Sequence, residues 1–282
     1  MSSSEPRFID MSEWTASGGG AFSETYFHKS DSTFLLKMMA GNASEKDLKR
    51  EFSNASAAYR LGLPTPEPGE LVTDGKRIGI LFKRMVDKIS YARAIGQYPD
   101  RIDHLAKDFS ATVKKLHATD CPEGLFPDVR VSYAELIRNN KFRSEAVRRH
   151  ALDFLLSIPD CPTFLHGDLH FGNMVMSGGR SYIIDLTNLC HGHPYIDFGM
   201  IPALLLFSEA FPEKFVEDYH CTPEQATMFW HCFLKEYFGP GTDTRKKEEE
   251  LKPYAALRLL SSETEFGAPV PISSADELLK CL

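Results

Sequence analysis

A short stretch of the chain, FLHGDLHFGNMVMSGGRSYIIDLTN, concentrates side chains that bind metals or move protons. It contains His166, Asp168 and His170 at alternate positions, and Asn173 and Asp185 follow them. This density of histidine, carboxylate and amide groups is typical of two kinds of site, a metal-dependent hydrolase and a phosphoryl-transfer enzyme. The secondary structure expected around these side chains distinguishes between these two kinds of site.

The second half of this stretch is expected to fold as a β-hairpin. Two short apolar segments flank Gly178-Gly179, which is the pattern of strands joined by a tight turn. Folding the hairpin brings its open ends together, and Asn173 and Asp185 stand at those ends. An amide oxygen beside a carboxylate suits Mg²⁺ better than zinc. Asp168, in the loop that enters the hairpin, is expected to point into the same cleft.

A zinc-dependent hydrolase is the alternative, because H-x-D-x-H resembles a fragment of a metal-hydrolase site. It requires His166, Asp168 and His170 to converge, with His191 and His193 as further ligands. That arrangement leaves the two ends of the hairpin unused. In the competing interpretation, His166 braces the loop by hydrogen bonds, and His191 and His193 are loop residues near the substrate opening.

The N-terminal part combines a glycine-rich stretch, SGGG, with a lysine inside an apolar run, TFLLKMM. The lysine of this run, Lys37, interrupts a predicted strand. A helix is predicted over residues 44–61, and Glu51 lies beside its apolar stripe. A lysine in apolar surroundings is costly unless it is paired. Glu51 is therefore expected to be its partner, with Glu45 as the alternative.

The hydrophobic pattern changes from strand-like to helical along the chain. Alternating apolar segments and a D-G turn fill the first part, and apolar residues recur every three or four positions afterwards. Helices are expected at 102–117, 132–157 and 202–238. The pattern predicts an α+β fold, with a small β-rich N-terminal lobe at residues 1–86 and a larger, mainly helical C-terminal lobe at residues 87–282.

The composition of the chain argues against a nucleic-acid-binding protein and against a membrane-spanning protein. The 282 residues carry a formal net charge of −7, and all of this excess falls in residues 187–282. Nucleic acid is not expected as a partner, because no basic stripe is present to neutralise phosphates. No apolar segment is long enough for a membrane span. Six scattered cysteines without a C-x-x-C motif indicate reduced thiols in a cytoplasmic protein.

The motif H-G-D-x-x-x-x-N, followed twelve residues later by aspartate, resembles the aminoglycoside phosphotransferase-like family. That family is related to choline kinases and, more distantly, to protein kinases. The resemblance covers about residues 15–200 and includes G-x-P at 192–194 and a further aspartate, Asp197. The family usually has an acidic residue where this chain has His193, so the contribution of that position is open. Asp197 is expected to hold loop backbone amides, which is a structural use of a buried carboxylate.

The resemblance implies a bilobal protein-kinase-like fold and a role for each matching residue. Asp168 corresponds to the aspartate that orients the acceptor hydroxyl and accepts its proton. Asn173 and Asp185 correspond to the two Mg²⁺ ligands. Lys37 corresponds to the lysine that contacts the α- and β-phosphates of ATP, and Glu51 to the helix glutamate that pairs with it.

The glycine-rich stretch precedes Lys37 at the distance of one hairpin, so it is expected to cover the phosphates. Its cofactor-binding residues are then Gly19, Gly20 and Ser23. The stretch departs from the pattern G-x-G-x-x-G, and an ordinary glycine turn is the competing interpretation.

These residues predict an ATP-dependent phosphotransferase that moves the γ-phosphate of Mg-ATP to a hydroxyl of a small molecule. The acceptor is an aminoglycoside, an amino-alcohol or a sugar-like compound. Two alternatives remain at this point, the metal-dependent hydrolase that uses His166, Asp168 and His170, and a catalytically silent kinase-like binding module. The acceptor and the oligomeric state are not predicted.

Overall fold

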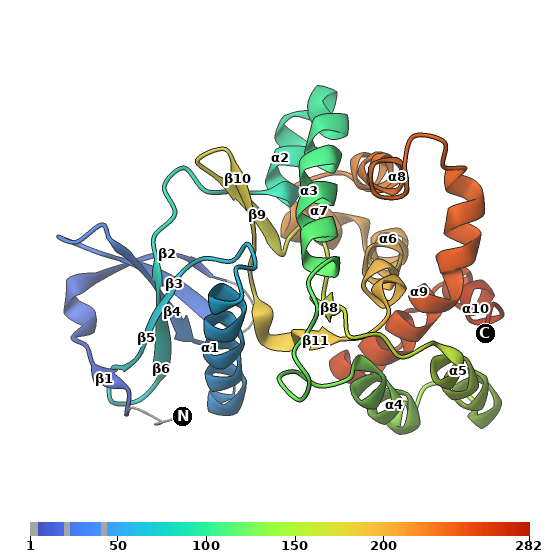
Figure 1. Cartoon of the computed structure of the whole chain (residues 1–282), viewed down its shortest axis with the longest axis horizontal. Helices are drawn as coiled ribbons and strands as arrows, with labels where there is room; N and C mark the ends of the chain where they lie inside the picture. The colour runs from blue at the N-terminus through green and yellow to red at the C-terminus, as the bar shows by residue number, and fades with distance from the viewer. Residues whose placement is uncertain (1–4, 20–22, 41–43) are drawn as a thin grey trace. The chain divides into compact units, whose positions relative to one another are not determined.

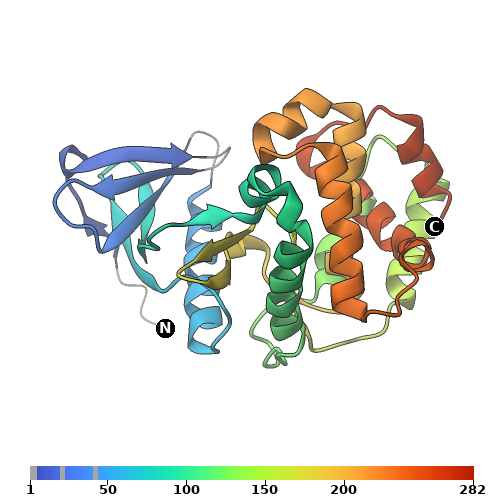
Figure 2. The same ribbon diagram turned by 90° about the horizontal axis from the view of Figure 1, so that it is seen from above.

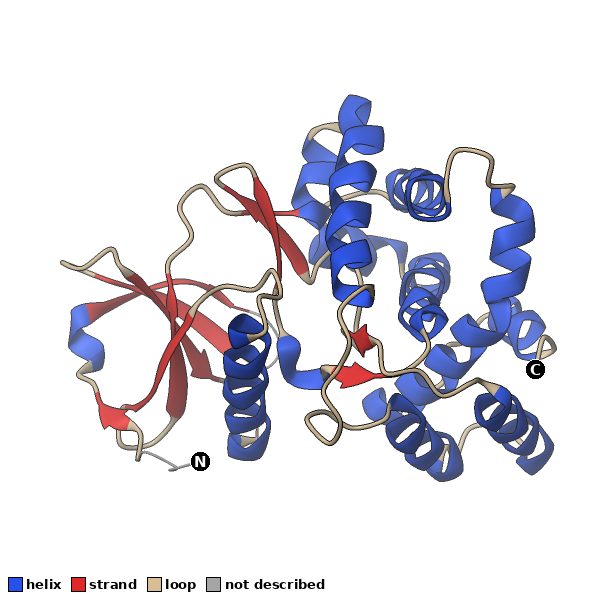
Figure 3. Cartoon of the chain, viewed as in Figure 1, coloured by secondary structure: helices blue, strands red, loops and turns tan. Residues whose placement is uncertain are grey.

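Strands and helices concentrate in different parts of the chain (Figure 3). The computed structural model describes residues 5–19, 23–40 and 44–282. The chain divides into two compact units. The first unit comprises Met1–Lys88 together with Val175–Asn188, and the second comprises Ile89–Met174 together with Leu189–Leu282.

This division differs from a single cut between residues 86 and 87, because the segment 175–188 packs with the first unit. The backbone N–H of Ile183 donates to the carbonyl of Pro64 at 2.7 Å. The Asn54 side chain donates to the carbonyl of Leu186 at 2.8 Å. The segment that carries Asp185 is therefore fixed to the first unit by hydrogen bonds.

The first unit contains a six-stranded sheet of order β1-β5-β6-β4-β3-β2, in which only the β1–β5 pair is parallel. Its strands are β1 (Arg7–Phe8), β2 (Trp14–Gly19), β3 (Ser23–His28), β4 (Phe34–Met39), β5 (Pro68–Thr73) and β6 (Ile78–Lys83). The unit also contains the short 3₁₀ helices η1 (Met11–Glu13) and η3 (Leu186–Asn188). The predicted hairpin of β9 (Met174–Ser177) and β10 (Arg180–Ile183) belongs to it as well, except for Met174.

Helix α1 (Glu45–Arg60) lies against one face of this sheet (Figure 1). It begins where the Ser44 side chain accepts a hydrogen bond from the N–H of Asp47, which satisfies one of the free donors of the first turn. Leu48 packs with Ile80 of β6 on this face. The helix predicted over 44–61 is confirmed, and its apolar stripe faces the sheet.

The alternation of side chains in β4 separates the apolar core from Lys37. Leu36 and Met38 are fully buried and pack with Val72 and Leu81 on one face of the sheet. Lys37 lies between them in sequence and therefore points to the opposite face, where α1 is found. The period of two in the strand places one cation beside the helix without disturbing the core.

The second unit is mainly helical. Its helices are α2 (Tyr91–Gln97), α3 (Ile102–His117), α4 (Val129–Asn139), α5 (Glu145–Ser157), α6 (Met200–Ala210), α7 (Pro212–Tyr219), α8 (Pro223–Phe238), α9 (Thr244–Phe266) and α10 (Ser273–Leu279). Its shorter elements are β7 (Ile89–Ser90), η2 (Pro99–Arg101), β8 (Phe164–Leu165), β11 (Cys190–His191) and η4 (Pro194–Gly199). Among the described residues, no helix is both long and apolar enough to cross a membrane.

The helix predicted at 102–117 is confirmed, and several helices fill the stretches 132–157 and 202–238, as predicted. Proline explains the breaks in the second stretch. Pro212 and Pro223 stand at the first positions of α7 and α8, where a missing N–H costs nothing, and neither can continue the preceding helix.

Aromatic side chains form the contact between α3 and α8, which run side by side (Figure 2). Phe109 of α3 makes edge-to-face contacts with Phe229 and Phe233 of α8, with ring centroids 5.2 and 5.4 Å apart. This geometry is favourable for aromatic pairs beyond the area that they bury.

Helix α9 packs closely against η4, and a glycine permits the contact. A Cβ atom added at Gly199 would lie 2.4 Å from the carbonyl oxygen of Tyr254 in α9. Any other residue at this position would push the two elements apart. Since η4 carries Asp197, this contact joins α9 to an element that holds the backbone of the loop after β8.

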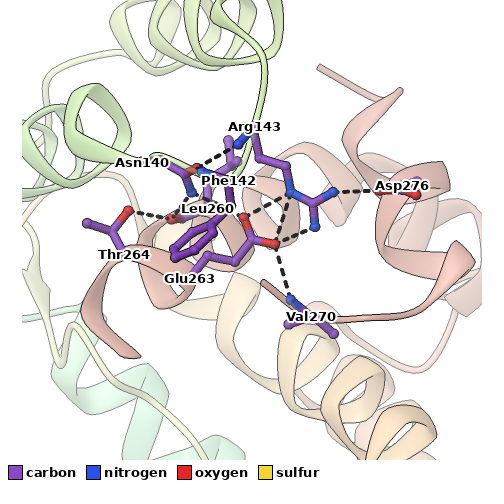
Figure 4. A network of polar contacts seen from close by, with 8 residues as sticks. All are labelled: Asn140, Phe142, Arg143, Leu260, Glu263, Thr264, Val270 and Asp276. Atoms are coloured by element: carbon purple, nitrogen blue, oxygen red, sulfur yellow. Dashed lines mark hydrogen bonds and ion pairs between the residues drawn. The ribbon is translucent and has the colours of Figure 1, made fainter. Parts of the chain in front are cut away.

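A network of buried polar groups fastens the end of α9 to neighbouring segments (Figure 4). The buried Glu263 carboxylate accepts hydrogen bonds from Arg143, from the Asn140 side chain at 3.1 Å and from the N–H of Val270 at 3.3 Å. Arg143 also pairs with the exposed Asp276 of α10 at 2.6 Å. The network joins α9, α10 and the segment between α4 and α5.

We expect Glu263→Gln to lower the free energy of unfolding by about 3–5 kcal/mol, because it removes the charge that compensates a largely buried arginine. Asp276→Asn, at the exposed end of the same network, is expected to cost about 0–1 kcal/mol. Urea denaturation followed by far-ultraviolet circular dichroism measures both changes. Equal effects of the two substitutions would contradict a structural role for the buried carboxylate.

Candidate active site

The first cluster of predicted residues lies in the first unit, where Lys37 of β4 contacts Glu51 of α1. The Lys37 Nζ atom donates to both carboxylate oxygens of Glu51, at 2.6 and 2.8 Å. Glu51 is 5% exposed. Glu45, the alternative partner, pairs with Lys49 on the outside of the same helix. The predicted pairing of Lys37 with Glu51 is confirmed.

The pKa values of Lys37 and Glu51 depend on their burial and on the nearby carboxylate of Asp185. Burial lowers the pKa of Lys37, but the charges of Glu51 and Asp185 outweigh it and raise the pKa above its ordinary value. Burial and the nearby Asp185 raise the pKa of Glu51, while Lys37 opposes this shift. Lys37 is therefore held as a cation between two carboxyl groups.

Asp185 follows β10 and lies near the same lysine. Its Oδ2 atom is 3.8 Å from Lys37 Nζ, and its Oδ1 atom accepts a hydrogen bond from Thr187 at 3.2 Å. Its φ angle is +60°, in the left-handed region that non-glycine residues rarely occupy. Such backbone strain persists only where the surrounding structure enforces it, and it is common at functional sites. Half of the side chain remains exposed and available to a ligand.

A pocket of about 560 Å³ connects these residues within the first unit. Lys37, Glu51 and Asp185 line one part of it. The remaining wall is mostly apolar and includes Leu35 and Phe82. The volume falls in the usual range for cofactor sites, and an apolar wall beside a few charged groups is their usual composition.

The described part of the glycine-rich stretch lies in a strand. Gly18 and Gly19 belong to the end of β2 and pair with Thr25 and Glu24 of β3, because the strand continues through them. Ser23, at the start of β3, lines the pocket, whereas Gly19 is not among the lining residues of that pocket. Gly20 lies outside the described residues. The phosphate-covering role of this stretch stays a prediction.

The second cluster lies in the second unit, around the loop that follows β8. Asp197 of η4 is fully buried, and its two carboxylate oxygens accept the N–H groups of His166 and Gly167, both at 2.8 Å. Gly167 has a φ of +77°, a conformation that favours glycine. His117 of α3 lies 3.1 Å from the same carboxylate. The expectation that Asp197 holds loop backbone amides is confirmed.

Asp168 is held at the centre of this cluster. Its Oδ2 atom accepts the Asn173 side-chain N–H at 3.0 Å and lies 3.8 Å from His170 Nε2. Its Oδ1 atom is 3.3 Å from an Nη atom of Arg258. Burial alone would raise the pKa of Asp168, but His170, Arg258 and His166 together lower it below its ordinary value. The carboxylate is thus ionised at neutral pH and able to accept a proton.

The residues matched to Mg²⁺ ligands have suitable chemistry. The Asn173 side-chain N–H group donates to both the carbonyl and the carboxylate of Asp168, at 3.0 Å each, so its carbonyl oxygen is left for another partner. Asp185 offers a half-exposed carboxylate. Both are hard oxygen donors of the kind that Mg²⁺ prefers. Asn173 belongs to the second unit and Asp185 to the first, and their joint use as ligands stays a prediction.

The histidines of this region have structural contacts. The His191 ring lies 3.0 Å from the carbonyl of Phe126, and the His193 ring accepts the N–H of Tyr195 at the start of η4. Burial and the neighbouring His117 lower the pKa of His193. His193 precedes η4 and is a loop residue as predicted, whereas His191 belongs to the short strand β11, so its assignment to a loop is wrong.

The hydrolase alternative receives no support from the geometry. Among the described residues, a group of donor atoms close enough to hold a metal is formed by Asp128, Asp160 and His191, and it does not include His166, Asp168 or His170. The guanidinium of Arg130 already bridges the two carboxylates of that group, at 2.6 and 2.9 Å.

Several charged residues at these clusters were not predicted from the sequence, including Lys83, Arg84, Asp87 and Lys88 of the pocket. Lys88 lines the pocket of the first unit, and burial together with Lys37 lowers its pKa. Arg258 contacts Asp168 from α9, a helix for which only the charged run at 245–250 gave a signal. No motif marks Lys88 or Arg258, because their positions depend on where separate elements meet.

Comparison with known proteins gives a consistent result. A family model described as "Phosphotransferase enzyme family" matches residues 13–228. This match confirms the resemblance found in the sequence. No curated protein matches the chain in sequence.

Several solved structures share the fold. A choline/ethanolamine kinase family protein from Mesorhizobium loti is similar with a TM-score of 0.58 at 15% identity, over 95% of this chain and 86% of that one. ADP-bound aminoglycoside phosphotransferase APH(2'')-Ib has a TM-score of 0.57 at 17% identity, over 95% and 92% of the two chains.

A thermostable mutant of aminoglycoside phosphotransferase APH(4)-Ia, in a ternary complex with ADP and hygromycin B, has a TM-score of 0.61 at 14% identity, over 96% and 92% of the two chains. At these identities the likeness concerns the fold alone. It confirms the α+β, kinase-like fold that the sequence predicts.

Proposed function

Because the chain belongs to the phosphotransferase enzyme family, we propose that it transfers the γ-phosphate of ATP to a hydroxyl of a small molecule, with Mg²⁺ as cofactor. The observation that carries this proposal is the Lys37–Glu51 ion pair at the wall of the pocket. A cation held rigidly beside a cofactor-sized cavity is what binding of the α- and β-phosphates requires. The apolar wall of the same pocket suits a nucleotide base.

The chain supplies three contributions to the reaction. Lys37 holds the phosphates, and Ser23 donates to them from the edge of the pocket. Asn173 and Asp185 hold Mg²⁺, which when bound neutralises the charge of the β- and γ-phosphates. Asp168 orients the acceptor hydroxyl.

The transfer step involves one bond formed and one broken. The acceptor oxygen bonds to the γ-phosphorus as the bond between that phosphorus and the bridging oxygen breaks, and ADP leaves with the electron pair. The hydroxyl proton passes to the Asp168 carboxylate and then to solvent. The pKa of Asp168 lies below its ordinary value, so the carboxylate is ionised, and its main contribution is to orient the hydroxyl.

The proposed acceptor is an aminoglycoside, an amino-alcohol or a sugar-like compound. Similar structures hold hygromycin B in one case and streptomycin in another. The excess acidic charge in residues 187–282 favours an acceptor that carries amines, since it attracts cations. We also propose a cytoplasmic location, because the six cysteines are free thiols.

We expect Asp185→Asn to weaken Mg²⁺-dependent ATP binding by about 10–100-fold, because the substitution removes a carboxylate from the metal site. Asparagine tolerates the left-handed backbone at this position, so the fold should persist. Calorimetric titration of ATP with and without Mg²⁺ measures the effect. Equal ATP affinity of the wild-type protein under both conditions would contradict the proposed function.

Asp87→Asn is the matched control for this experiment. Asp87 also has a left-handed backbone, with a φ of +54°, and carries the same charge. Because Asp87 also lines the pocket, its substitution changes the charge near the nucleotide by the same amount, but it should preserve the ratio of the ATP affinities with and without Mg²⁺. An equal loss in both variants would indicate a general charge effect in place of metal ligation.

A further inference from the structure

Arg258 is a buried arginine whose side chain joins α9 to the catalytic loop. It is 4% exposed. One Nη atom lies 3.3 Å from Asp168 Oδ1, and the other donates to Glu265 Oε2 at 3.1 Å. Its Nε–H group points to the sulfur of Met200 at 3.0 Å. All three nitrogens of the guanidinium therefore have partners within the second unit.

The sequence of α9 explains this arrangement. Arg258 and Glu265 are seven residues apart, so they lie on the same side of the helix two turns apart. That side meets the loop of Asp168. Burial lowers the pKa of Arg258, but Tyr133, Glu265 and Asp168 raise it above its ordinary value, so the guanidinium is a permanent cation.

The contacts argue against a direct role in substrate binding. Arg258 is almost fully buried, and each of its guanidinium nitrogens already contacts a partner in the second unit, so it is not placed as a direct ligand of a phosphate or an acceptor. Its planar shape does, however, constrain the carboxylates that it bonds, because charge-assisted hydrogen bonds from arginine are directional. Any influence of Arg258 on the reaction must then pass through Asp168.

We propose that Arg258 is a positioning residue for phosphoryl transfer, which fixes the orientation of the Asp168 carboxylate toward the acceptor hydroxyl. This inference rests on the proposed function. Arg258 holds Oδ1 while the Asn173 amide holds Oδ2, so the two contacts together set the plane of the carboxylate. Arg258 itself neither gives nor takes a proton. Catalysis depends on such alignment, and a small misplacement costs about 10²-fold in rate.

Glu265 accepts a hydrogen bond from the Nη atom of Arg258 that does not contact Asp168. Its carboxylate is partly exposed, and burial together with Asp168 raises its pKa, against the influence of Arg258. With Glu265 removed, Arg258 keeps its bond to Asp168 but loses one of its two anchors. Glu265→Gln should therefore lower turnover less than Arg258→Ala does.

The test uses steady-state ADP release from Mg-ATP, with choline, hygromycin B and streptomycin supplied together as acceptors. Arg258→Ala is expected to lower kcat by about 10²-fold with little change in the KM for ATP, because Lys37 and Asp185 are untouched. Added guanidinium ion should restore part of the loss. Arg258→Lys should not restore full activity, because an ammonium cannot replace a planar fork.

A double substitution separates positioning from a direct effect. If Arg258 acts only through Asp168, removing it in an Asp168→Asn background should cause no further loss of kcat. A loss in the double variant equal to the product of the two single losses would overturn the inference.

Arg143→Ala is the matched control for a merely structural role. Arg143 is also a largely buried arginine paired with a glutamate of α9, but it contacts Glu263 and not Asp168. It should lower the melting temperature while keeping kcat at temperatures where the protein is folded. If Arg258→Ala behaves in the same way, with a lower melting temperature and wild-type kcat, the inference fails and the proposed function stands. If the wild-type protein releases no ADP, the proposed function itself fails.

Discussion

Asp168→Asn is expected to lower turnover by about 10²–10⁴-fold, because it removes the group that accepts the acceptor's proton. The amide has nearly the same shape, and Arg258 keeps its bond to Glu265, so the fold should persist. ATP binding should also survive, since the pocket belongs to the first unit. Steady-state kinetics and nucleotide titration on the same preparation measure these two effects separately.

Asp160→Asn is the control for this substitution. Asp160 lies in the same unit and is 77% exposed, with Arg130 as its ion-pair partner. The same loss of one negative charge there should leave kcat and ATP affinity unchanged. Turnover of Asp168→Asn within a few-fold of the wild-type value would remove Asp168 from the mechanism.

Lys37→Ala is expected to lower kcat/KM for ATP by about 10²–10³-fold, with a higher KM and a lower kcat. Both parameters should change, because a lysine that holds the phosphates contributes in the bound state and more strongly in the transition state. Unchanged ATP kinetics would show that the pocket of the first unit does not bind the nucleotide.

The partner of Lys37 gives an internal check. Glu51→Gln should produce a milder form of the same defect, and the double variant should lose less than the two single losses combined. Glu45→Gln and Lys49→Ala alter the exposed ion pair on the same helix and should have no effect on ATP kinetics. A defect in Glu45→Gln with normal kinetics in Glu51→Gln would contradict the importance of the observed pairing.

The contacts that were predictable from the sequence are those within short segments or between regular neighbours. The period of two in β4 and the stripe of α1 are enough to bring Lys37 and Glu51 to the same layer. The Gly178-Gly179 turn likewise predicts the hairpin that precedes Asp185. Local propensity and periodicity determine these elements, so the pattern is visible in the chain.

Features that depend on distant elements were not predictable in the same way. The contact of Arg258 with Asp168 joins residues ninety positions apart, and it depends on the packing of α9 against η4. The inclusion of residues 175–188 in the first unit depends on hydrogen bonds to Pro64 and Asn54. The course of β2 through Gly18 and Gly19 opposes the local preference of glycine, because pairing with β3 outweighs it.

The most direct test of the central claim follows the γ-phosphate itself. The wild-type protein is incubated with ATP that carries a radioactive γ-phosphate, with Mg²⁺ or with a chelator, and with choline, hygromycin B and streptomycin as acceptors. The account predicts that the label appears covalently on an acceptor only when Mg²⁺ is present, and that Asp168→Asn abolishes most of this transfer. Label that stays on ATP under all conditions, or that appears only as inorganic phosphate, would contradict it.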